Sequence, residues 1–209
     1  MNLISYLDKH FYTKDKFLAL SKVTNKKFME FQTLGIMPSC SYLLKTDISC
    51  HSFFGEHKEQ ATQEYYAKGN LSWLGTLLAL HQPSDAFPIF KERYQSELNR
   101  LKDAGFTSND PRVTSKIDQH ILEEWGYFID GTYGLCTKTG LPEDIAAKEL
   151  AILIINNLLN TGSLSDSDIT DLGKAVDLLD NASSLFAPHE RPDSSRQRLV
   201  VEIRRKYKL

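Results

Sequence analysis

The hydrophobic and polar positions of this chain follow a helical period over most of its length. Three short helices are predicted first. One covers residues 2–9, one is capped by Thr13 and breaks around residues 21–23, and one runs from Thr24 to Leu34. Each threonine hydroxyl is placed to accept a hydrogen bond from an amide of the following turn. Three closely spaced helices with a tight turn between the second and third are typical of a helix-turn-helix.

The third predicted helix has one apolar stripe and a clear end. Phe28, Phe31 and Leu34 recur at three-residue spacing and predict its buried face. Gly35 follows as the helix stop, and Pro38 keeps the chain from resuming the helix. Residues 41–45 and 50–54 then read as two short strands, the outline of a wing.

Every strong signal beyond residue 56 is helical. The predicted helices cover residues 56–68, residues 71–81, Ser84 to Gly105, Asp110 through Trp125 (with Ile117, Ile121, Leu122 and Trp125 inward), residues 142–159, and Ser165 through Leu179. Residues 131–140 are predicted to form a loop, and a linker at residues 188–192 precedes a basic tail. The pattern therefore predicts a mainly α protein, with a winged helix-turn-helix at residues 1–55 and an all-helical domain at residues 56–209.

The amino-acid composition indicates which class of protein the sequence encodes. Hydrophobic residues at 41% and charged residues at 25% indicate a globular chain with a core of normal size. The longest apolar run, residues 150–155, is too short to span a membrane, and no signal peptide is visible, so no membrane partner is expected. Three scattered cysteines cannot complete a disulfide framework, which favours a reducing, cytoplasmic setting.

The net charge of −2 is unevenly distributed. Residues 1–46 carry seven lysines against three acidic residues, and residues 189–209 carry seven basic against three acidic residues. The segment between them holds 11 basic and 21 acidic residues. Basic ends on an acidic body suit a chain whose ends touch a polyanion. The alternative is that the basic termini are simply solvated.

The N-terminal signature resembles that of MerR-type winged-helix regulators. The residues that carry the resemblance are Tyr12-Thr13, Phe17, Leu20-Ser21, Val23-Thr24, Phe28, Phe31 and Gly35-Ile36-Met37-Pro38. The resemblance implies that the helix from Thr24 to Leu34 enters a major groove of double-stranded DNA while a wing near residues 42–45 touches the backbone. The DNA-binding residues it implies are Lys26, Lys27, Tyr42 and Lys45, with the lysines on phosphates.

Two features depart from that family. Its members usually place arginines on the recognition helix, whereas this helix has lysines beside Met29 and Glu30. Lysine lacks the two-pronged donor geometry that reads guanine best. The long dimerising coiled coil is also missing, because no heptad pattern is sustained. The winged helix can therefore equally be a packing or protein-docking module.

A second resemblance covers nearly the whole chain. Residues 125–137, residues 142–149 and residues 38–42 are similar to a bacterial family whose members carry the label "natural product biosynthesis protein". That label implies a genomic association and names no reaction.

The segment from Gly131 to Thr137 is a candidate ligand site. Its two glycines, three residues apart, permit close backbone approach, and Tyr133 and Cys136 could point into one cavity. A nucleophilic Cys136 would need an activating base, for which His81 and His120 are candidates that the sequence does not place nearby. The alternative is a packed loop with a buried thiol.

No cofactor and no metal ion are predicted. The set Cys40, Cys50, His51 and His57 has the right elements but fits no common zinc spacing. The acidic residues of the segment 166–171 suit the first turn of a helix and lack the glycine and distal glutamate of an EF-hand loop.

Two functions follow from these patterns, and an enzyme is the less favoured third. The first is a DNA-binding transcriptional regulator whose helical domain senses a small-molecule ligand or forms a homodimer. The alternative is a non-catalytic accessory or binding protein of a biosynthetic pathway, in which the winged helix is structural and Tyr133 and Cys136 hold the ligand. The third uses Cys136 as a nucleophile.

Overall fold

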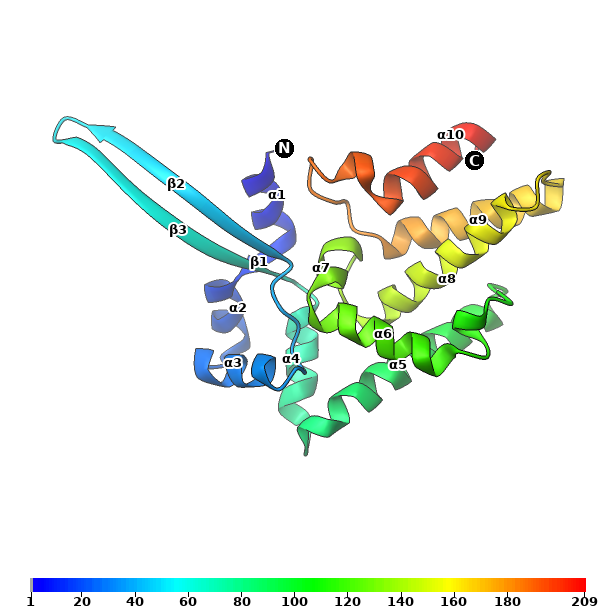
Figure 1. Cartoon of the computed structure of the whole chain (residues 1–209), viewed down its shortest axis with the longest axis horizontal. Coiled ribbons are helices and arrows are strands. Elements are labelled where there is room, and N and C mark those ends of the chain that lie inside the picture. The colour runs from blue at the N-terminus through cyan, green and yellow to red at the C-terminus, as the bar shows by residue number, and fades with distance from the viewer. Residues whose placement is uncertain (1) are drawn as a thin grey trace.

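The computed structural model describes residues 2–209 and is mainly helical, with one small antiparallel sheet of three strands (Figure 1). A winged helix-turn-helix forms the N-terminal part, and an all-helical body follows it. The fold class predicted from the sequence is confirmed.

The winged helix begins with α1 (Leu3–His10), β1 (Phe11–Thr13), α2 (Lys14–Ser21) and α3 (Asn25–Thr33). The predicted caps are present: the Thr13 hydroxyl accepts from the Lys16 amide, and the Thr24 hydroxyl accepts from the Lys27 amide, both at 3.3 Å. Gly35 follows α3 with a φ of +66°, a left-handed conformation that favours glycine. Phe28 and Phe31 are buried as predicted, but Leu34 at the end of the stripe is half exposed.

The wing is a long hairpin, which we call the arm. Its strands are β2 (Tyr42–Ser52) and β3 (Gly55–Ala67), and β3 also pairs with β1, giving the sheet order β1-β3-β2. The arm projects from the rest of the molecule (Figure 1). At its tip Phe53 and Phe54 are 97% and 96% exposed and contact each other edge to face.

Two predictions for this region are wrong. The strand expected at residues 50–54 is instead the end of β2 and the turn. The polar helix expected at residues 56–68 is instead most of β3. Glutamate, lysine, glutamine and alanine favour helices, and the outer part of β3 is exposed on both faces, so no alternating pattern marks it as a strand. The predicted boundary after residue 55 falls where β3 begins, inside the hairpin.

The helical body contains α4 (Asn70–Ala79), α5 (Ala86–Asp103), α6 (Ile117–Ile129), α7 (Thr132–Cys136), α8 (Pro142–Leu159), α9 (Asp166–Ala182) and α10 (Glu202–Tyr207), together with single turns at Pro83–Asp85, Pro111–Val113 and Arg191–Asp193 and a π-helical turn at Gln197–Val201. The helices α8 and α9 lie side by side, with α10 over α9 (Figure 1). Within residues 2–209, no helix is both long enough and apolar enough to cross a bilayer.

The body corrects three smaller predictions. The segment 131–140 is not entirely a loop, because it contains α7. The helix expected from Asp110 starts later, at Ile117, after a 3-10 turn that Asp110 caps through the Arg112 amide. Leu122 is 57% exposed instead of inward, because α6 turns the positions of Ile121 and Phe128 to the core.

One hydrophobic core spans the winged helix and the body. It contains Phe17 and Phe28 from α2 and α3 and continues through Trp73 of α4 to Phe90 and Phe128. The Trp73 ring is fully buried, packs edge-on against the Phe128 ring at 5.1 Å, and donates from its indole N–H to the Ile36 carbonyl at 2.8 Å. The winged helix is therefore held against the body by shared packing.

Replacing Trp73 with alanine should destabilise the whole protein. Loss of a fully buried tryptophan typically costs about 3–5 kcal/mol in the free energy of unfolding. Chemical denaturation followed by circular dichroism measures this change, with the exposed Leu122→Ala as control. Unfolding of α1–α3 alone in Trp73→Ala, with the body unchanged, would contradict a shared core.

Candidate functional site

The outer face of α3 is open. Lys26, Met29, Glu30 and Thr33 are exposed along it, while Phe28 faces the core. In Figure 1 the helix lies at the edge of the molecule, away from α9 and α10. Its surroundings therefore leave room for a large partner such as a duplex.

The two lysines of α3 differ in their contacts. Lys26 is exposed and makes no ion pair within residues 2–209. The Lys27 ammonium lies 3.1 Å from a Glu30 carboxylate oxygen and 4.5 Å from the centre of the Phe31 ring. Lys26 is thus the freer cation, and Lys27 must leave Glu30 to reach a phosphate.

The predicted wing residues lie on β2 with different exposure. The Tyr42 hydroxyl donates to Glu190 at 2.7 Å, and the ring packs edge-on against Phe11 at 5.0 Å. Burial, with Glu190 close by, raises the pKa of Tyr42 above its usual value. Tyr42 therefore ties the arm to the C-terminal segment, whereas Lys45 is exposed opposite Thr62.

The arm carries more acidic than basic residues. Residues 42–67 contain two lysines and four acidic residues, namely Asp47, Glu56, Glu59 and Glu64. Because DNA backbones repel negative charge, the outer arm is a poor phosphate-binding surface.

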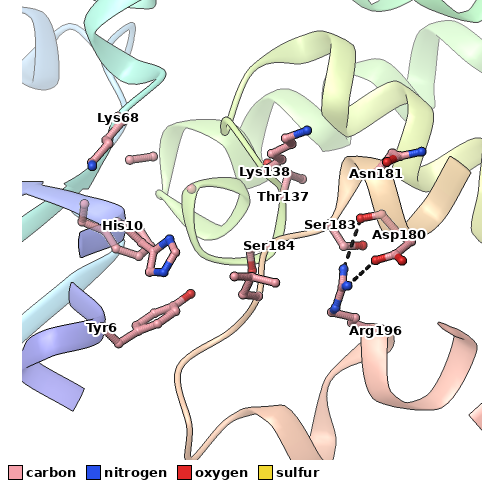
Figure 2. A pocket seen from close by; sticks show the side chains of 14 residues that line it. Tyr6, His10, Lys68, Thr137, Lys138, Asp180, Asn181, Ser183, Ser184 and Arg196 are labelled. Carbon is pink, nitrogen blue, oxygen red and sulfur yellow. Dashed lines mark hydrogen bonds and ion pairs between the residues drawn. The ribbon is translucent and has the colours of Figure 1, made fainter. Parts of the chain in front are cut away.

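A pocket lies where the winged helix meets the body (Figure 2). Its volume of about 350 Å³ lies in the range of small-molecule sites. Tyr6, His10 and Lys68 line one side, and Thr137, Ser183 and other residues of the body line the opposite side. No sequence pattern predicts this pocket, because its walls come from segments far apart in the chain.

The pocket has an excess of positive charge. Arg196 is ion-paired with Asp180, while Lys68 and Lys138 have no ion pair within residues 2–209. The Lys68 ammonium donates a hydrogen bond to the Lys9 carbonyl at 2.7 Å. The pKa of His10 is lowered by burial and by the charges of Lys9 and Lys68. The Ser183 hydroxyl is buried and has no hydrogen-bond partner in the part of the chain that the structure describes. These groups suit an anion that also accepts a hydrogen bond.

The short helix α7 separates this pocket from a second polar region. Gly134 and Thr137 face the pocket, but Tyr133 and Cys136 lie on the other side, among groups of α6 and α8. Adding a Cβ at Gly134 would bring it 2.1 Å from the Ser41 Oγ, so glycine allows α7 to pack this closely. Tyr133 and Cys136, which were predicted to point into one cavity, do lie together, in a buried cluster beside the core.

We call His120, Glu124, Tyr133, Lys148 and Glu149 the polar cluster. Tyr133 donates a hydrogen bond to Glu124, and the Lys148 ammonium lies 5.9 Å from the centre of the Tyr133 ring. Burial, with Glu149 close by, raises the pKa of Glu124 to about 7. Burial also lowers the pKa of His120 and raises that of Glu149.

Sequence reasoning found only part of this cluster. His120 entered only as a candidate base for Cys136, and the three charged members were missed. One signal was available: His120 and Glu124 are four residues apart, which places both on the same face of a helix as the buried Ile121 and Phe128. Glu149 and Lys148 lie in the most apolar predicted helix, where a buried charge indicates a paired or functional group.

The basic C-terminal tail makes ion pairs with α9. It forms α10, and Arg204 donates to Asp177 and to Asp180, both at 2.6 Å. Arg205 and Lys206 lie with Arg204 in the last turn of α10.

These features define a winged-helix protein with an all-helical body and a cation-lined pocket at their junction. The chain belongs to a family of unknown function (DUF6058), whose model matches residues 86–208 and so covers most of the body. No curated protein and no solved structure matches the chain.

The thiols should differ in reactivity. Cys50 is exposed on the arm, whereas burial raises the pKa of both Cys40 and Cys136. We expect one fast-reacting thiol with Ellman's reagent at neutral pH, lost in Cys50→Ser and retained in Cys136→Ser. A fast phase that disappears in Cys136→Ser would instead support a nucleophilic Cys136.

Proposed function

We propose that the chain is a DNA-binding regulator that places α3 in a major groove and binds an anionic effector in the junction pocket. The observation that carries the proposal is the arrangement of α1–α3 and the sheet. The face of α3 opposite Phe28 and Phe31 is open, while Phe28 and Phe31 pack into the core shared with the body. The DNA-binding mode would be that of MerR-type regulators without their coiled coil.

The proposed DNA contacts centre on α3. Lys26 and Lys27 would neutralise phosphates, and Lys45 at the base of the arm could reach the flanking backbone. A Tyr42 contact would require its hydrogen bond to Glu190 to break. The acidic outer arm is expected to stay off the duplex.

The proposed effector site connects both parts of the chain. Its walls include α1 and β3 of the winged helix and α7 and the end of α9 from the body. A ligand with negative charge would pair with Lys68 and Lys138 and accept a hydrogen bond from Ser183. Because the walls belong to both parts, such a ligand would further stabilise the position of the winged helix that the shared core sets. A reducing cytoplasm suits this role and the three free cysteines.

A second function is favoured by the arm itself. Two aromatic rings exposed at the end of a long acidic hairpin suit docking to another protein. In this alternative, the chain is a non-catalytic accessory protein of a biosynthetic pathway, and its winged helix is structural. Absence of DNA binding at low salt would favour it.

Charge removal on α3 should weaken DNA binding in a salt-dependent way. Fluorescence anisotropy with a mixed-sequence duplex, from about 50 to 200 mM salt, measures affinity and its salt slope. The double variant Lys26→Ala, Lys27→Ala should bind more weakly and lose roughly two units of slope, since each phosphate contact contributes about 0.9. Lys174→Ala on α9 is the control with the same type of charge change. Identical binding by the double variant and the wild type would contradict the assignment.

Anions should stabilise the protein through the pocket. Pyrophosphate at 100 times its dissociation constant would raise the free energy of unfolding by about 2.7 kcal/mol, visible as a higher melting temperature. Lys68→Ala combined with Lys138→Ala should remove this stabilisation, whereas Lys58→Ala on the arm should keep it. An equal shift in all three proteins would mean that the anion acts elsewhere.

A further inference from the structure

Three potential ligand side chains meet in the polar cluster. One ligand atom each from His120, Glu124 and Glu149 can be chosen so that the three lie within 4.8 Å of one another. His120 and Glu124 come from successive turns of α6, and Glu149 comes from the adjacent α8. A metal ion could therefore be held with small side-chain movements.

Several polar atoms in this region lack partners. His120 is 6% exposed, and its Nδ1 lies 3.7 Å from a Glu124 carboxylate oxygen. Within residues 2–209, its Nε2 and the hydroxyl of the fully buried Tyr94 have no hydrogen-bond partner. The two rings lie 6.4 Å apart, nearly perpendicular. Glu149 has no hydrogen bond or ion pair in the part of the chain that the structure describes. Buried polar groups are normally satisfied, so this group of orphans indicates a missing partner.

The nearby cations do not supply that partner. The Arg112 guanidinium donates to both carboxylate oxygens of Asp110 at 3.0 Å. The Lys148 ammonium lies near the Tyr133 ring and Cys136 and forms no ion pair within 4.0 Å with either glutamate. The carboxylates of the buried Glu124 and the partly buried Glu149 thus lie close together without an ion pair to Arg112 or Lys148.

We propose that His120, Glu124 and Glu149 bind a divalent first-row transition metal ion such as Zn²⁺ or Mn²⁺. One imidazole and two carboxylates suit these ions, whereas Mg²⁺ and Ca²⁺ prefer all-oxygen ligands. The hydrogen bond from Tyr133 to Glu124 would orient that ligand. Three protein ligands would leave a fourth coordination position open. The site is independent of the proposed DNA binding, and all three ligands lie within the family-matched segment.

Isothermal titration of Zn²⁺, and separately of Mn²⁺, into chelator-treated full-length protein tests the site. The arm could bind metal adventitiously through its exposed His51 and His57, so the reference protein carries His51→Ala and His57→Ala. One ion per chain should bind to the reference. Adding Glu149→Gln should weaken binding by at least about 100-fold, because a charged ligand is lost.

Thermal unfolding provides the second readout. Zn²⁺ should raise the melting temperature of the reference protein but not that of the Glu149→Gln protein. Without metal, the Glu149→Gln protein should melt at the same temperature as the reference or higher, since it buries one charge fewer. Should Glu149→Gln fail to fold, Glu124→Gln replaces it. No binding by the reference, or equal affinity in the glutamine variants, would overturn the proposal.

Discussion

The hydrogen bond from the Trp73 indole to the Ile36 carbonyl lies at the junction on which the structure depends. It links α4 of the body to the segment that follows α3, inside a core shared by aromatic rings from both parts. Separating the winged helix from the body would expose these aromatic rings to water, which is the main cost of separation. The orientation of α3 is therefore fixed by the body.

The same junction explains why the pocket and the polar cluster are neighbours. Packing the winged helix on the body brings β3 against α7, a helix of five residues. One side of α7 closes the cation-lined pocket, and the other carries Tyr133 and Cys136 into the buried cluster. The helix α7 therefore contacts both the polar cluster and the end of β3 at the base of the arm. The Tyr42–Glu190 hydrogen bond attaches that base to the C-terminal segment as well.

Local chemistry determined what the sequence could predict. The caps at Thr13 and Thr24 and the stop at Gly35 depend on neighbouring residues, and all three are confirmed. A wing was predicted, but the strand over residues 56–68 was missed. An exposed strand has no buried face to impose alternation, so its helix-favouring residues dominated the pattern. The pocket and the cluster depend on contacts between distant segments. Only the spacing of His120 and Glu124 pointed toward the cluster, and nothing local placed Glu149 beside them.

We propose that α3 is the surface that meets DNA. Amide chemical-shift mapping on the isotope-labelled full chain, titrated with a mixed-sequence duplex at low salt, tests this proposal residue by residue. We expect shifts concentrated on α3 and the start of α2, with the arm tip at Phe53 and Phe54 unaffected. Shifts confined to the arm or to α10, or none at all, would contradict it.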